Sequence, residues 1–339
     1  MLNNYFNLGN KQVGVNEKPF VIAEAGSNFN QSIDTARELI DVAVEAKADA
    51  VKFQLFQADI LFPLKNGLYD LFKSIELNHD WVPELKSYAD KAGIQFSASA
   101  FDFNSINVLE EIDVSFHKIA SSETTNLPLV HHLASTGKPL VISTGMCDMV
   151  DVEEAISVCL GVGNNRIILM QCGAMYPLPL ELANLKVLKT FFERFGGVVG
   201  FSDHTISMTA AIAAIGLGAT VFEKHFTLDR KSEGPDHSYA IEPKELKSYV
   251  DYLHEAHSTL GISDKQMLQS EREGGRREGL YASRAIEVGE RLVASDINLK
   301  RPAIGLRARY ANILVGAVAK RNIDKEQPIT WDLISFDRK

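Results

Sequence analysis

Eight short apolar runs, each followed by a stretch with helical periodicity, fill residues 20–261 of this 339-residue chain. The runs have the length of β-strands, and they are Phe20–Ala23, Ala50–Phe53, Ile94–Ala98, Ser115–Ile119, Leu140–Ile142, Ile167–Met170, Val198–Phe201 and Thr220–Glu223. Eight strand–helix units in about 250 residues predict a (β/α)8 TIM barrel. A doubly wound open sheet is the competing fold, but no Gly-x-Gly-x-x-Gly segment follows the first run.

The barrel prediction also locates a site, because the active sites of such barrels lie at the C-terminal ends of the strands. Polar and charged residues recur at these ends, and they are Glu24, Lys52, Gln54, Ser97, Ser99, Lys118, Ser121, Glu123, Ser143, Thr144, Gln171, Cys172, Tyr176, Ser202, His204, Glu223 and His225. Each lysine alone could equally be a structural salt-bridge residue. The whole ring indicates function, because burying so many unpaired polar groups is costly.

Two histidines, His204 and His225, follow the last two runs and lie 21 residues apart, which is the length of one helix plus one strand. Two imidazoles at the same end of adjacent parallel strands can share a metal ion, and imidazole is a common ligand of transition metals. Either histidine alone is more commonly a capping or core-edge residue. Because Ser202, Asp203 and Glu223 accompany them, the pair predicts a metal site.

The composition excludes several kinds of partner. A net charge of −9 offers no general attraction for nucleic acid. The first residues lack the basic and apolar regions of a secretory signal, and the longest apolar run, Ala210–Phe222, is too short to span a membrane. Three cysteines without a disulfide or metal spacing suit a reducing compartment. We therefore expect a cytoplasmic protein that binds neither nucleic acid nor membranes.

The sequence changes in character after Gly261. Residues 262–279 hold many charges and predict a linker. Residues 280–339 return to short β-rich pieces, namely Leu280–Ala285, Arg291–Val293, Ile297–Lys300, Val315–Val318 and Pro328–Thr330. We expect a barrel domain over residues 1–261 and a small β-rich domain over residues 280–339, whose size is marginal for independent stability.

Several motifs occur in order along the whole chain. They are Ile22-Ala-Glu-Ala-Gly-Ser-Asn, Val51-Lys-Phe-Gln, His117-Lys-Ile-Ala-Ser-Ser-Glu, Ile142-Ser-Thr-Gly-Met, Gly200-Phe-Ser-Asp-His-Thr, Glu223-Lys-His-Phe-Thr, Gly234-Pro-Asp-His, Arg276-Arg-Glu-Gly-Leu-Tyr-Ala-Ser-Arg and Leu299-Lys-Arg-Pro. The chain thus resembles the N-acetylneuraminate (sialic acid) synthase family, which includes legionaminate and pseudaminate synthases, and its tail resembles the family's antifreeze-like (SAF) domain. Phe56-Gln-Ala-Asp and Gly234–Ala240 are most similar to the branch of spore-coat polysaccharide synthesis.

The resemblance implies a transferase that condenses phosphoenolpyruvate with the open-chain aldehyde of an N-acyl hexosamine, giving a nonulosonic (sialic-type) acid and phosphate. It also implies a divalent metal cofactor, chiefly Mn, with Mg or Co as alternatives. The residues that match the family's site are Glu24 and Glu123 for catalysis; Lys52, Ser99, Lys118, Ser121, Ser143 and Ser202 for phosphoenolpyruvate; Gln54, Tyr176, Asp236 and Arg301 for the sugar; and His204 and His225 for the metal.

The tail has a role of its own by resemblance. In the family it swaps across a homodimer and lays an arginine over the sugar site of the partner. The matching residue is Arg301, which without the motif would be read as a solvated surface side chain. A flexible linker of about 18 residues spans roughly 20–25 Å as a random coil, so it is long enough for such a crossing.

Three positions depart from the family pattern. Ala174 stands where Asn, Ser or Thr is usual, Gln171 where His is common, and Phe29 where His often follows Asn28. We expect these changes to line the pocket, so they leave the identity of the sugar open.

Two other functions also remain open. A Schiff-base aldolase on the same fold would use Lys118 or Lys224 as its nucleophile. A non-catalytic carbohydrate-binding or ice-binding-like protein is suggested by the tail alone, and it leaves the polar ring of the barrel unexplained.

Overall fold

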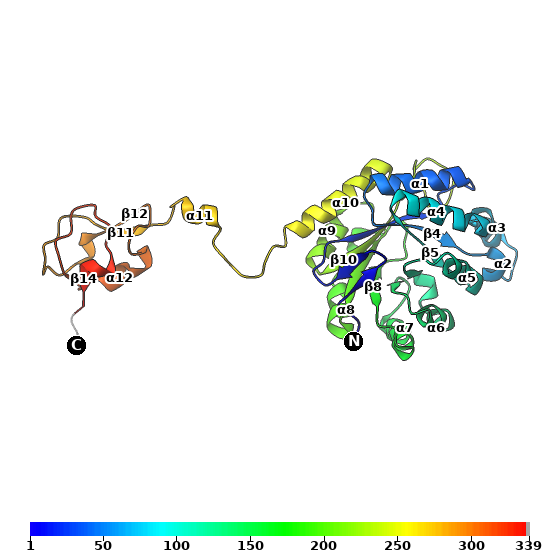
Figure 1. Ribbon diagram of the computed structural model, residues 1–339, viewed down its shortest axis with the longest axis horizontal. Helices are drawn as coiled ribbons and strands as arrows, with labels where there is room; N and C mark the ends of the chain where they lie inside the picture. Colours follow the sequence, from blue (N-terminus) through cyan, green and yellow to red (C-terminus); the bar gives the residue numbers. More distant parts are fainter. Residues whose placement is uncertain (337–339) are drawn as a thin grey trace. The chain divides into compact units, whose positions relative to one another are not determined.

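The computed structural model describes residues 1–336, and the chain forms two compact units that meet in sequence between Gly261 and Ile262. Figure 1 labels helices α1–α10 in the first unit and α11 and α12 in the second. The last three residues of the predicted tail domain lie outside the described residues.

Eight parallel strands close into a barrel in the first unit, which confirms the predicted fold. The strands are β3 (Phe20–Gly26), β4 (Ala50–Leu55), β5 (Gln95–Ala100), β6 (His117–Ile119), β7 (Leu140–Ser143), β8 (Ile167–Cys172), β9 (Val198–Asp203) and β10 (Ala219–His225). They follow chain order around the barrel, and β10 pairs with both β9 and β3 to close it. Most strands extend past the ends of the predicted apolar runs. His225 is therefore the last residue of β10 and does not follow it.

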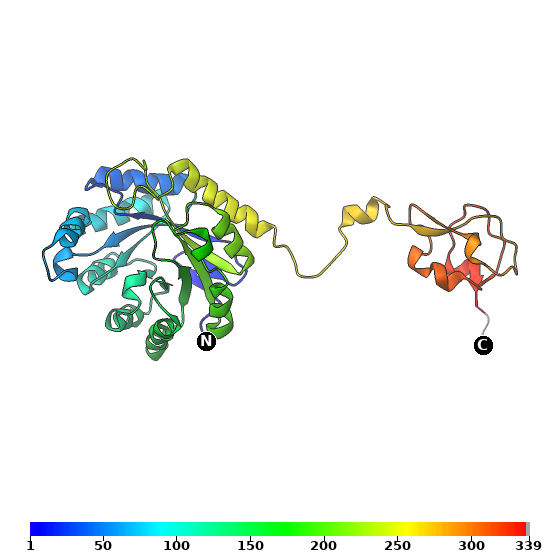
Figure 2. The ribbon, with the colours of Figure 1, turned by 180° about the vertical axis from the view of Figure 1, so that it is seen from behind.

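Helices surround the strands on the outside of the barrel, as Figures 1 and 2 show from opposite sides. They are α1 (Ile33–Glu45), α2 (Ala58–Leu61), α3 (Gly67–Ile75), α4 (Val82–Ala92), α5 (Phe103–Glu111), α6 (Leu127–Ser135), α7 (Met149–Gly161), α8 (Val187–Phe195), α9 (Thr209–Gly216) and α10 (Pro243–Ser258). One helix follows each strand, except that α2, α3 and α4 all follow β4.

Local sequence explains where these helices begin and which face they bury. Ser32 caps α1 by accepting a hydrogen bond from the backbone N–H of Thr35, and Leu39 and Ile40 lie on its buried face. In α7, Asp148 is the N-cap residue and Asp151 bonds back to the N–H of Asp148, which forms a capping box. The acidic residues at the start of this helix thus form a specific capping arrangement.

A hairpin that the sequence does not predict covers the N-terminal end of the barrel. It consists of β1 (Tyr5–Leu8) and β2 (Lys11–Gly14). Leu8 and Val13 of the hairpin belong to one buried apolar cluster with Phe20, Phe116 and other residues from the starts of the strands. This end of the barrel is therefore closed by apolar packing.

The second unit is a small β-rich domain with its own core. Its helices are α11 (Gln269–Glu273), which lies in the predicted linker, and α12 (Ala311–Leu314). Antiparallel pairs form between β11 (Gly279–Ala282) and β12 (Ile297–Lys300), and between β13 (Val318–Ala319) and β14 (Ile334–Ser335). The predicted strands at Arg291–Val293 and Pro328–Thr330 are wrong, because each forms one isolated bridge without a ladder. Pro328 lacks the N–H that a ladder requires.

Candidate active site

Four buried charges form a network among the inward-facing residues at the C-terminal end of the barrel. Lys52 Nζ lies 2.6 Å from Glu24 Oε2 and 3.7 Å from Glu223 Oε2, while Lys118 Nζ lies 3.6 Å from Glu223 Oε1. None of the four side chains is more than 5 % exposed. The strand register helps to group them, because it pairs Glu24 directly with Lys52. Two ammonium groups thus face two carboxyl groups, as buried charges require.

Serine hydroxyls accept hydrogen bonds from both lysines of this network. Lys52 donates to Ser99 Oγ at 2.8 Å, and Lys118 donates to Ser143 Oγ at 2.7 Å. The structure therefore brings four of the predicted phosphoenolpyruvate contacts into two Lys–Ser pairs, on four successive strands from β4 to β7.

The two remaining predicted serines lie next to the network. Ser202 donates to Glu223 Oε1 at 3.2 Å, and the backbone N–H of Gly145 donates to Ser121 Oγ at 3.0 Å. Cys172, for which the sequence predicts no role, lies between these two serines. Burial raises the pKa of its thiol, against the effect of hydrogen bonds with Ser121 and Ser202. This cysteine is therefore an uncharged wall of the site.

The two carboxyl groups of the network hold their protons differently. Burial alone would raise the pKa of Glu223, but Lys118 and Lys52 lower it to about 2. Burial raises the pKa of Glu24 to about 7, against the attraction of Lys52. Burial also lowers the pKa of Lys118. Glu223 is thus a permanent anion, whereas Glu24 can exchange a proton near neutral pH, which is a property of general acids and bases.

His204 and His225 lie side by side at the ends of β9 and β10, with ring centroids 5.4 Å apart. Burial lowers the pKa of both to about 3, so both are neutral at physiological pH, as metal-binding imidazoles must be. His204 Nδ1 lies 2.7 Å from the carbonyl oxygen of Gly173, and a proton donated there leaves Nε2 as the lone-pair nitrogen. His225 Nδ1 is buried without a hydrogen-bond partner.

The donor chemistry of this histidine pair fits a divalent ion of the Mn, Fe, Co or Zn type. No group of three or more His, Cys, Asp or Glu side chains in residues 1–336 is placed to hold a metal ion. A metal on the pair would therefore take its other ligands from substrate and water. Such open coordination is typical of catalytic sites and unlike closed structural ones.

Two tyrosines pack against the histidine pair. The ring of Tyr176 lies 4.2 Å from that of His204, the ring of Tyr239 lies 5.3 Å from that of His225, and the two tyrosine rings are 5.0 Å apart. Tyr239 lies in the loop between β10 and α10, and its hydroxyl donates to Asp236 Oδ1 at 2.6 Å. The predicted sugar contacts Tyr176 and Asp236 are thus joined through Tyr239.

Three predicted residues converge on Gly26. A methyl group placed on Gly26 would lie 2.9 Å from Asp236 Oδ2, 3.7 Å from Gln54 Nε2 and 3.7 Å from Glu24 Oε1. Gln54 Nε2 also donates to Glu24 Oε1 at 3.2 Å. Gly26 has a φ of 54°, a left-handed conformation that favours glycine. One amide and two carboxyl groups therefore pack around Gly26 at the end of β3 and leave no room for a side chain there.

The remaining two predicted residues, Glu123 and Arg301, lie in different units. Glu123 lies in the 3-10 turn after β6, next to Asn126 and Asp102, and burial raises its pKa. Arg301 belongs to the second unit, where its Nε lies 3.8 Å from Glu278 Oε1 and its side chain is 65 % exposed. The roles of Glu123 and Arg301 stay predictions.

Two of the three departures from the family pattern do not line the barrel interior, so that expectation is wrong for them. Phe29 is fully buried in the main core, with its ring 6.4 Å from that of Phe53. Gln171 points out of the barrel and donates to a backbone carbonyl of the β8–α8 loop at 3.0 Å. Alternate residues of a strand face opposite sides, which a match by sequence position does not reveal. Ala174 does lie at the barrel mouth, 3.3 Å from where Gly145 would carry a Cβ.

Lys224 points away from the barrel interior, which excludes it as a Schiff-base nucleophile. Its Nζ lies 3.1 Å from Asp203 Oδ2, donates to the carbonyl oxygen of Thr205, and lies 5.6 Å from the ring centre of Tyr249 in α10. A nucleophile must reach the substrate, and Lys224 is instead held in the layer between strand and helix. Lys118 remains as the lysine of the aldolase alternative.

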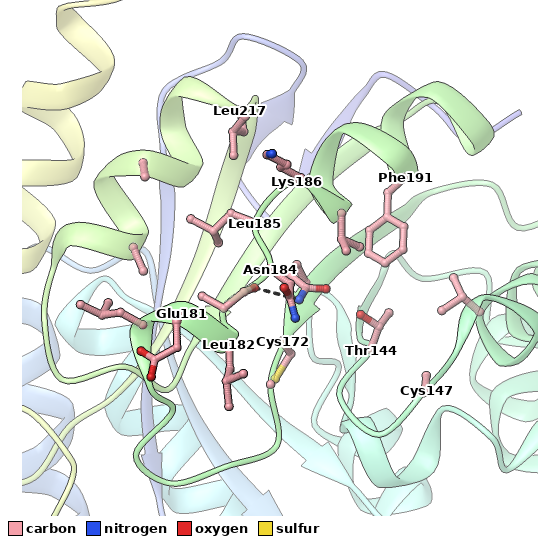
Figure 3. Close-up of a pocket in the computed structure, with 18 of the residues that line it drawn as sticks. Thr144, Cys147, Cys172, Glu181, Leu182, Asn184, Leu185, Lys186, Phe191 and Leu217 are labelled. Atoms are coloured by element: carbon pink, nitrogen blue, oxygen red, sulfur yellow. Dashed lines mark hydrogen bonds between the residues drawn. The ribbon is translucent and has the colours of Figure 1, made fainter.

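A cavity of about 870 Å³ lies on the outer side of β8, and it is not the site described above. Figure 3 shows its lining, which comes from α7, α8, α9 and the β8–α8 loop and includes Leu182, Leu185 and Phe191. Thr144, Gln171 and Cys172 of the predicted polar ring line it, but none of the residues matched to the family's site does. It shares Cys172 and Gly173 with the wall of the barrel mouth, but it lacks the paired charges. We therefore assign function to the barrel mouth.

Glu223 and Cys172 belong to the predicted polar ring without a role of their own, and Tyr239 is not predicted at all. A role for Glu223 could have been assigned, because it lies two positions before His225 on β10 and alternate residues share a face. Tyr239 lies in a loop, where no periodicity indicates direction. Its contact with Asp236, three residues earlier, appears only in the folded structure.

The fold and the barrel mouth define a barrel enzyme with a small β-rich second domain. Residues 39–265 match the NeuB family, and residues 277–335 match the SAF domain. The chain therefore belongs to the NeuB family, and it is a transferase of the sialic acid synthase type, as predicted from its motifs. Membership in this enzyme family removes the non-catalytic alternative.

Comparisons with individual proteins also support membership of this family. The chain is 36 % identical to the spore coat polysaccharide biosynthesis protein SpsE of Bacillus subtilis over an alignment of 359 residues, and this alignment covers 96 % of each chain. Over 346 residues it is 34 % identical to the N,N'-diacetyllegionaminic acid synthase of Legionella pneumophila, covering 96 % of this chain and 97 % of the other. The crystal structure of N-acetylneuraminic acid (sialic acid) synthetase from Leptospira borgpetersenii superposes with a TM-score of 0.76 at 32 % identity, covering 80 % and 95 % of the two chains. Across residues 1–336, no helix has both the length and the apolar character needed to cross a membrane.

Proposed function

We propose that this enzyme condenses phosphoenolpyruvate with the open-chain aldehyde of an N-acyl hexosamine in a reaction that depends on a divalent metal, giving a nonulosonic acid and phosphate. The observation that carries the proposal is the meeting of two kinds of group at one barrel mouth. Lys52 and Lys118 suit a phosphorylated, carboxylated anion, and the neutral pair of His204 and His225 suits a metal.

The charge balance of the network supports a requirement for metal. With Glu24 and Glu223 ionised, the two lysines are neutralised, and the network alone offers an anion with up to three charges no net attraction. A proton on Glu24, whose pKa is raised to about 7, frees one positive charge. A divalent ion on the histidine pair would supply two more.

The residues of the chain have separate tasks in this reaction. Lys52 and Lys118, with Ser99 and Ser143, bind the phosphate and carboxylate of phosphoenolpyruvate, and Glu223 holds both ammonium groups in position. A divalent metal, when bound, supplies Lewis-acid polarisation of the aldehyde oxygen.

The enol carbon of phosphoenolpyruvate then forms the new bond to the aldehyde carbon. Protonated Glu24 gives its proton to the aldehyde oxygen, which becomes a hydroxyl group. Water adds to the phosphate-bearing carbon and loses a proton to the Glu24 carboxylate. The C–O bond to phosphate breaks, the remaining hydroxyl proton passes to the departing phosphate, and the carbonyl of the keto acid forms. Glu24 suits both proton transfers because burial raises its pKa to about 7.

A phosphate-release assay tests the proposal. The metal-free enzyme is supplied with phosphoenolpyruvate, Mn, Mg or Co, and a panel of N-acyl hexosamines. We expect phosphate only when phosphoenolpyruvate, metal and an N-acyl hexosamine are all present, with a nonulosonic acid as the co-product in mass spectrometry. The absence of phosphate release with every hexosamine and every metal would contradict the proposal.

The Schiff-base aldolase is the second candidate, because burial lowers the pKa of Lys118 and so favours its nucleophilic neutral form. EDTA should abolish turnover by the proposed synthase and spare turnover by an aldolase. Borohydride reduction in the presence of pyruvate should leave Lys118 unmodified in a peptide map. A reduced pyruvyl adduct on Lys118 would establish the aldolase instead.

We also propose that the second unit acts across a homodimer, where Arg301 reaches the sugar site of the partner. The charge distribution supports this arrangement. Residues 1–261 contain 20 Lys and Arg against 33 Asp and Glu, whereas residues 262–339 contain 15 against 11. A basic second unit attached to an acidic barrel favours electrostatic association between the two.

A further inference from the structure

We infer that Tyr239 is a specificity-determining residue, which orients Asp236 and walls one side of a subsite for an uncharged, hydroxyl-rich acceptor with an apolar face. The inference deepens the proposed function and rests on it for the identity of the reaction. The residues of this subsite, which we call the acceptor subsite, are Gly26, Gln54, Tyr176, Asp236 and Tyr239.

The floor of the acceptor subsite is polar and carries negative charge. Asp236 Oδ2 and Gln54 Nε2 both lie within 4 Å of the position that a Cβ of Gly26 would take, as does Glu24 Oε1. Within residues 1–336, Lys52 is the one cation that forms an ion pair with any of these groups, and its partner is Glu24. Carboxylates accept hydrogen bonds from hydroxyl and amide groups and repel phosphate. The floor therefore selects a sugar without a phosphate group.

The wall of the acceptor subsite is aromatic. The rings of Tyr176 and Tyr239 lie 5.0 Å apart and pack against His204 and His225. A tyrosine ring offers an apolar face together with a polar hydroxyl. An acceptor with C–H groups on one side and hydroxyls on the other matches this combination of wall and floor.

Tyr239 links the wall to the floor. Its hydroxyl donates to Asp236 Oδ1 at 2.6 Å, and the other oxygen, Oδ2, packs against Gly26, 2.9 Å from where a Cβ would stand. With one oxygen held by Tyr239 and the other packed against Gly26, the carboxylate has a fixed orientation before a substrate hydroxyl approaches it. Because the bond has a charged acceptor, it is among the stronger kinds of hydrogen bond.

The loop that carries Asp236 and Tyr239 is anchored at His237, which points away from the subsite. His237 Nδ1 lies 2.6 Å from Thr227 Oγ1, and Nε2 lies 2.9 Å from Asn30 Oδ1 in the β3–α1 loop. The imidazole therefore ties the loop to the residues that follow both β10 and β3. Such support positions a binding residue before the substrate arrives.

Removal of one oxygen atom tests the inference. Tyr239→Phe keeps the ring and deletes the bond to Asp236. We expect the KM of the acceptor hexosamine to rise about tenfold, with kcat and the KM of phosphoenolpyruvate changed by less than about twofold. Tyr252→Phe is the matched control, because Tyr252 lies exposed on α10 in the same unit and should leave every constant unchanged. Equal increases of both KM values, or none in that of the acceptor, would overturn the inference.

A double-mutant cycle separates positioning from general damage. In an Asp236→Ala background, Tyr239→Phe should add less than about a twofold further loss of acceptor affinity, because its partner is already gone. A full additional loss would show that Tyr239 does not act through Asp236. Unchanged thermal melting of Tyr239→Phe would exclude a folding defect.

A direct binding measurement tests the inference independently of the proposed reaction. Calorimetry with N-acyl hexosamines and their 6-phosphates, in the presence of phosphoenolpyruvate and EDTA, needs no turnover. We expect the neutral sugar to bind the wild type at least about tenfold more tightly than its phosphate, and Tyr239→Phe to weaken binding of the neutral sugar. If the wild type binds hexosamine in this way but never releases phosphate, the proposed function fails and the inference stands. Tighter binding of the phosphate, or no hexosamine binding at all, would overturn the inference.

Discussion

The two ends of the same eight-stranded barrel bury opposite kinds of side chain, apolar at one end and charged at the other. At the N-terminal end, the β1–β2 hairpin and the first residues of the strands form one apolar cluster that includes Phe20 and Phe116. At the C-terminal end, Lys52, Lys118 and Glu223 are buried just as deeply but are charged. The strands are continuous between the two ends, so the difference lies in the side chains and not in the backbone.

The two kinds of burial contribute differently to the stability of the fold. Apolar burial stabilises the closed end at about 25 cal/mol per Å² and needs no partner geometry. The desolvation cost of burying a charge is offset only when the charge has a partner. Replacing such pairs by apolar residues is commonly neutral or stabilising. The charged end therefore contributes little to folding for its area. Its arrangement suits the anion that we propose it binds.

The largest expected effect is on metal content and activity, when either histidine of the proposed metal site is replaced. His204→Ala and His225→Ala should each lose bound metal and lower kcat/KM by roughly 10³-fold. His131→Ala, at an exposed position of α6, is the control and should match the wild type in both properties. Stoichiometric metal by elemental analysis in both site variants would show that the metal lies elsewhere.

The second prediction compares the two ends directly. Glu223→Gln leaves two buried ammonium groups with one carboxyl partner and should cost about 3–5 kcal/mol in the free energy of unfolding. Phe116→Ala at the closed end should cost a similar amount through its cavity. Urea titration measures both variants, and kcat/KM distinguishes them.

We expect activity per folded molecule to persist in Phe116→Ala and to be lost in Glu223→Gln. Equal loss of activity in both variants would show that the two ends are not functionally separate.

The third prediction concerns the pH dependence of stability in the metal-free protein. His204 and His225 have pKa values lowered to about 3 in the fold, against an unperturbed value of 6.5. The unfolded chain therefore binds more protons, and stability is lost as the pH falls from about 6.5 toward 3. Glu24, whose pKa is raised to about 7, acts in the opposite direction between about pH 4.5 and 7.

Unfolding measured between about pH 6 and pH 4 tests this balance. His204→Asn should reduce the slope of stability against pH by about 1.4 kcal/mol per pH unit, the value for one proton. An unchanged slope would mean that His204 is not held neutral by burial.

The smallest expected effect concerns Arg301, in the second unit. Arg301→Ala should raise the KM of the acceptor about tenfold and leave that of phosphoenolpyruvate nearly unchanged. Mixing and refolding it with the inactive His204→Ala protein should restore activity if the arginine works across a dimer. Failure to recover would place Arg301 in its own chain or outside the site.

The barrel was predictable because its strands are apolar runs bounded by helical periodicity, and the barrel rule then located Lys52, Lys118 and the histidine pair. The β1–β2 hairpin was not, because polar residues and Gly9 interrupt its alternation of apolar side chains. Directions on strands and loops were the other weak point. Gln171 faces outward and Tyr239 faces a carboxylate from a loop, and contacts of this kind depend on the fold and not on spacing.

The position of Asp236 in the acceptor subsite depends on the absence of a side chain at Gly26. Gly26 occupies its place in a left-handed conformation, so any other residue would meet two obstacles, a strained backbone and the oxygen of Asp236. A larger residue would both strain β3 and displace the carboxylate of Asp236. Evolution of this enzyme toward a different acceptor is therefore expected to proceed through the side chains around Gly26, while the glycine itself is retained.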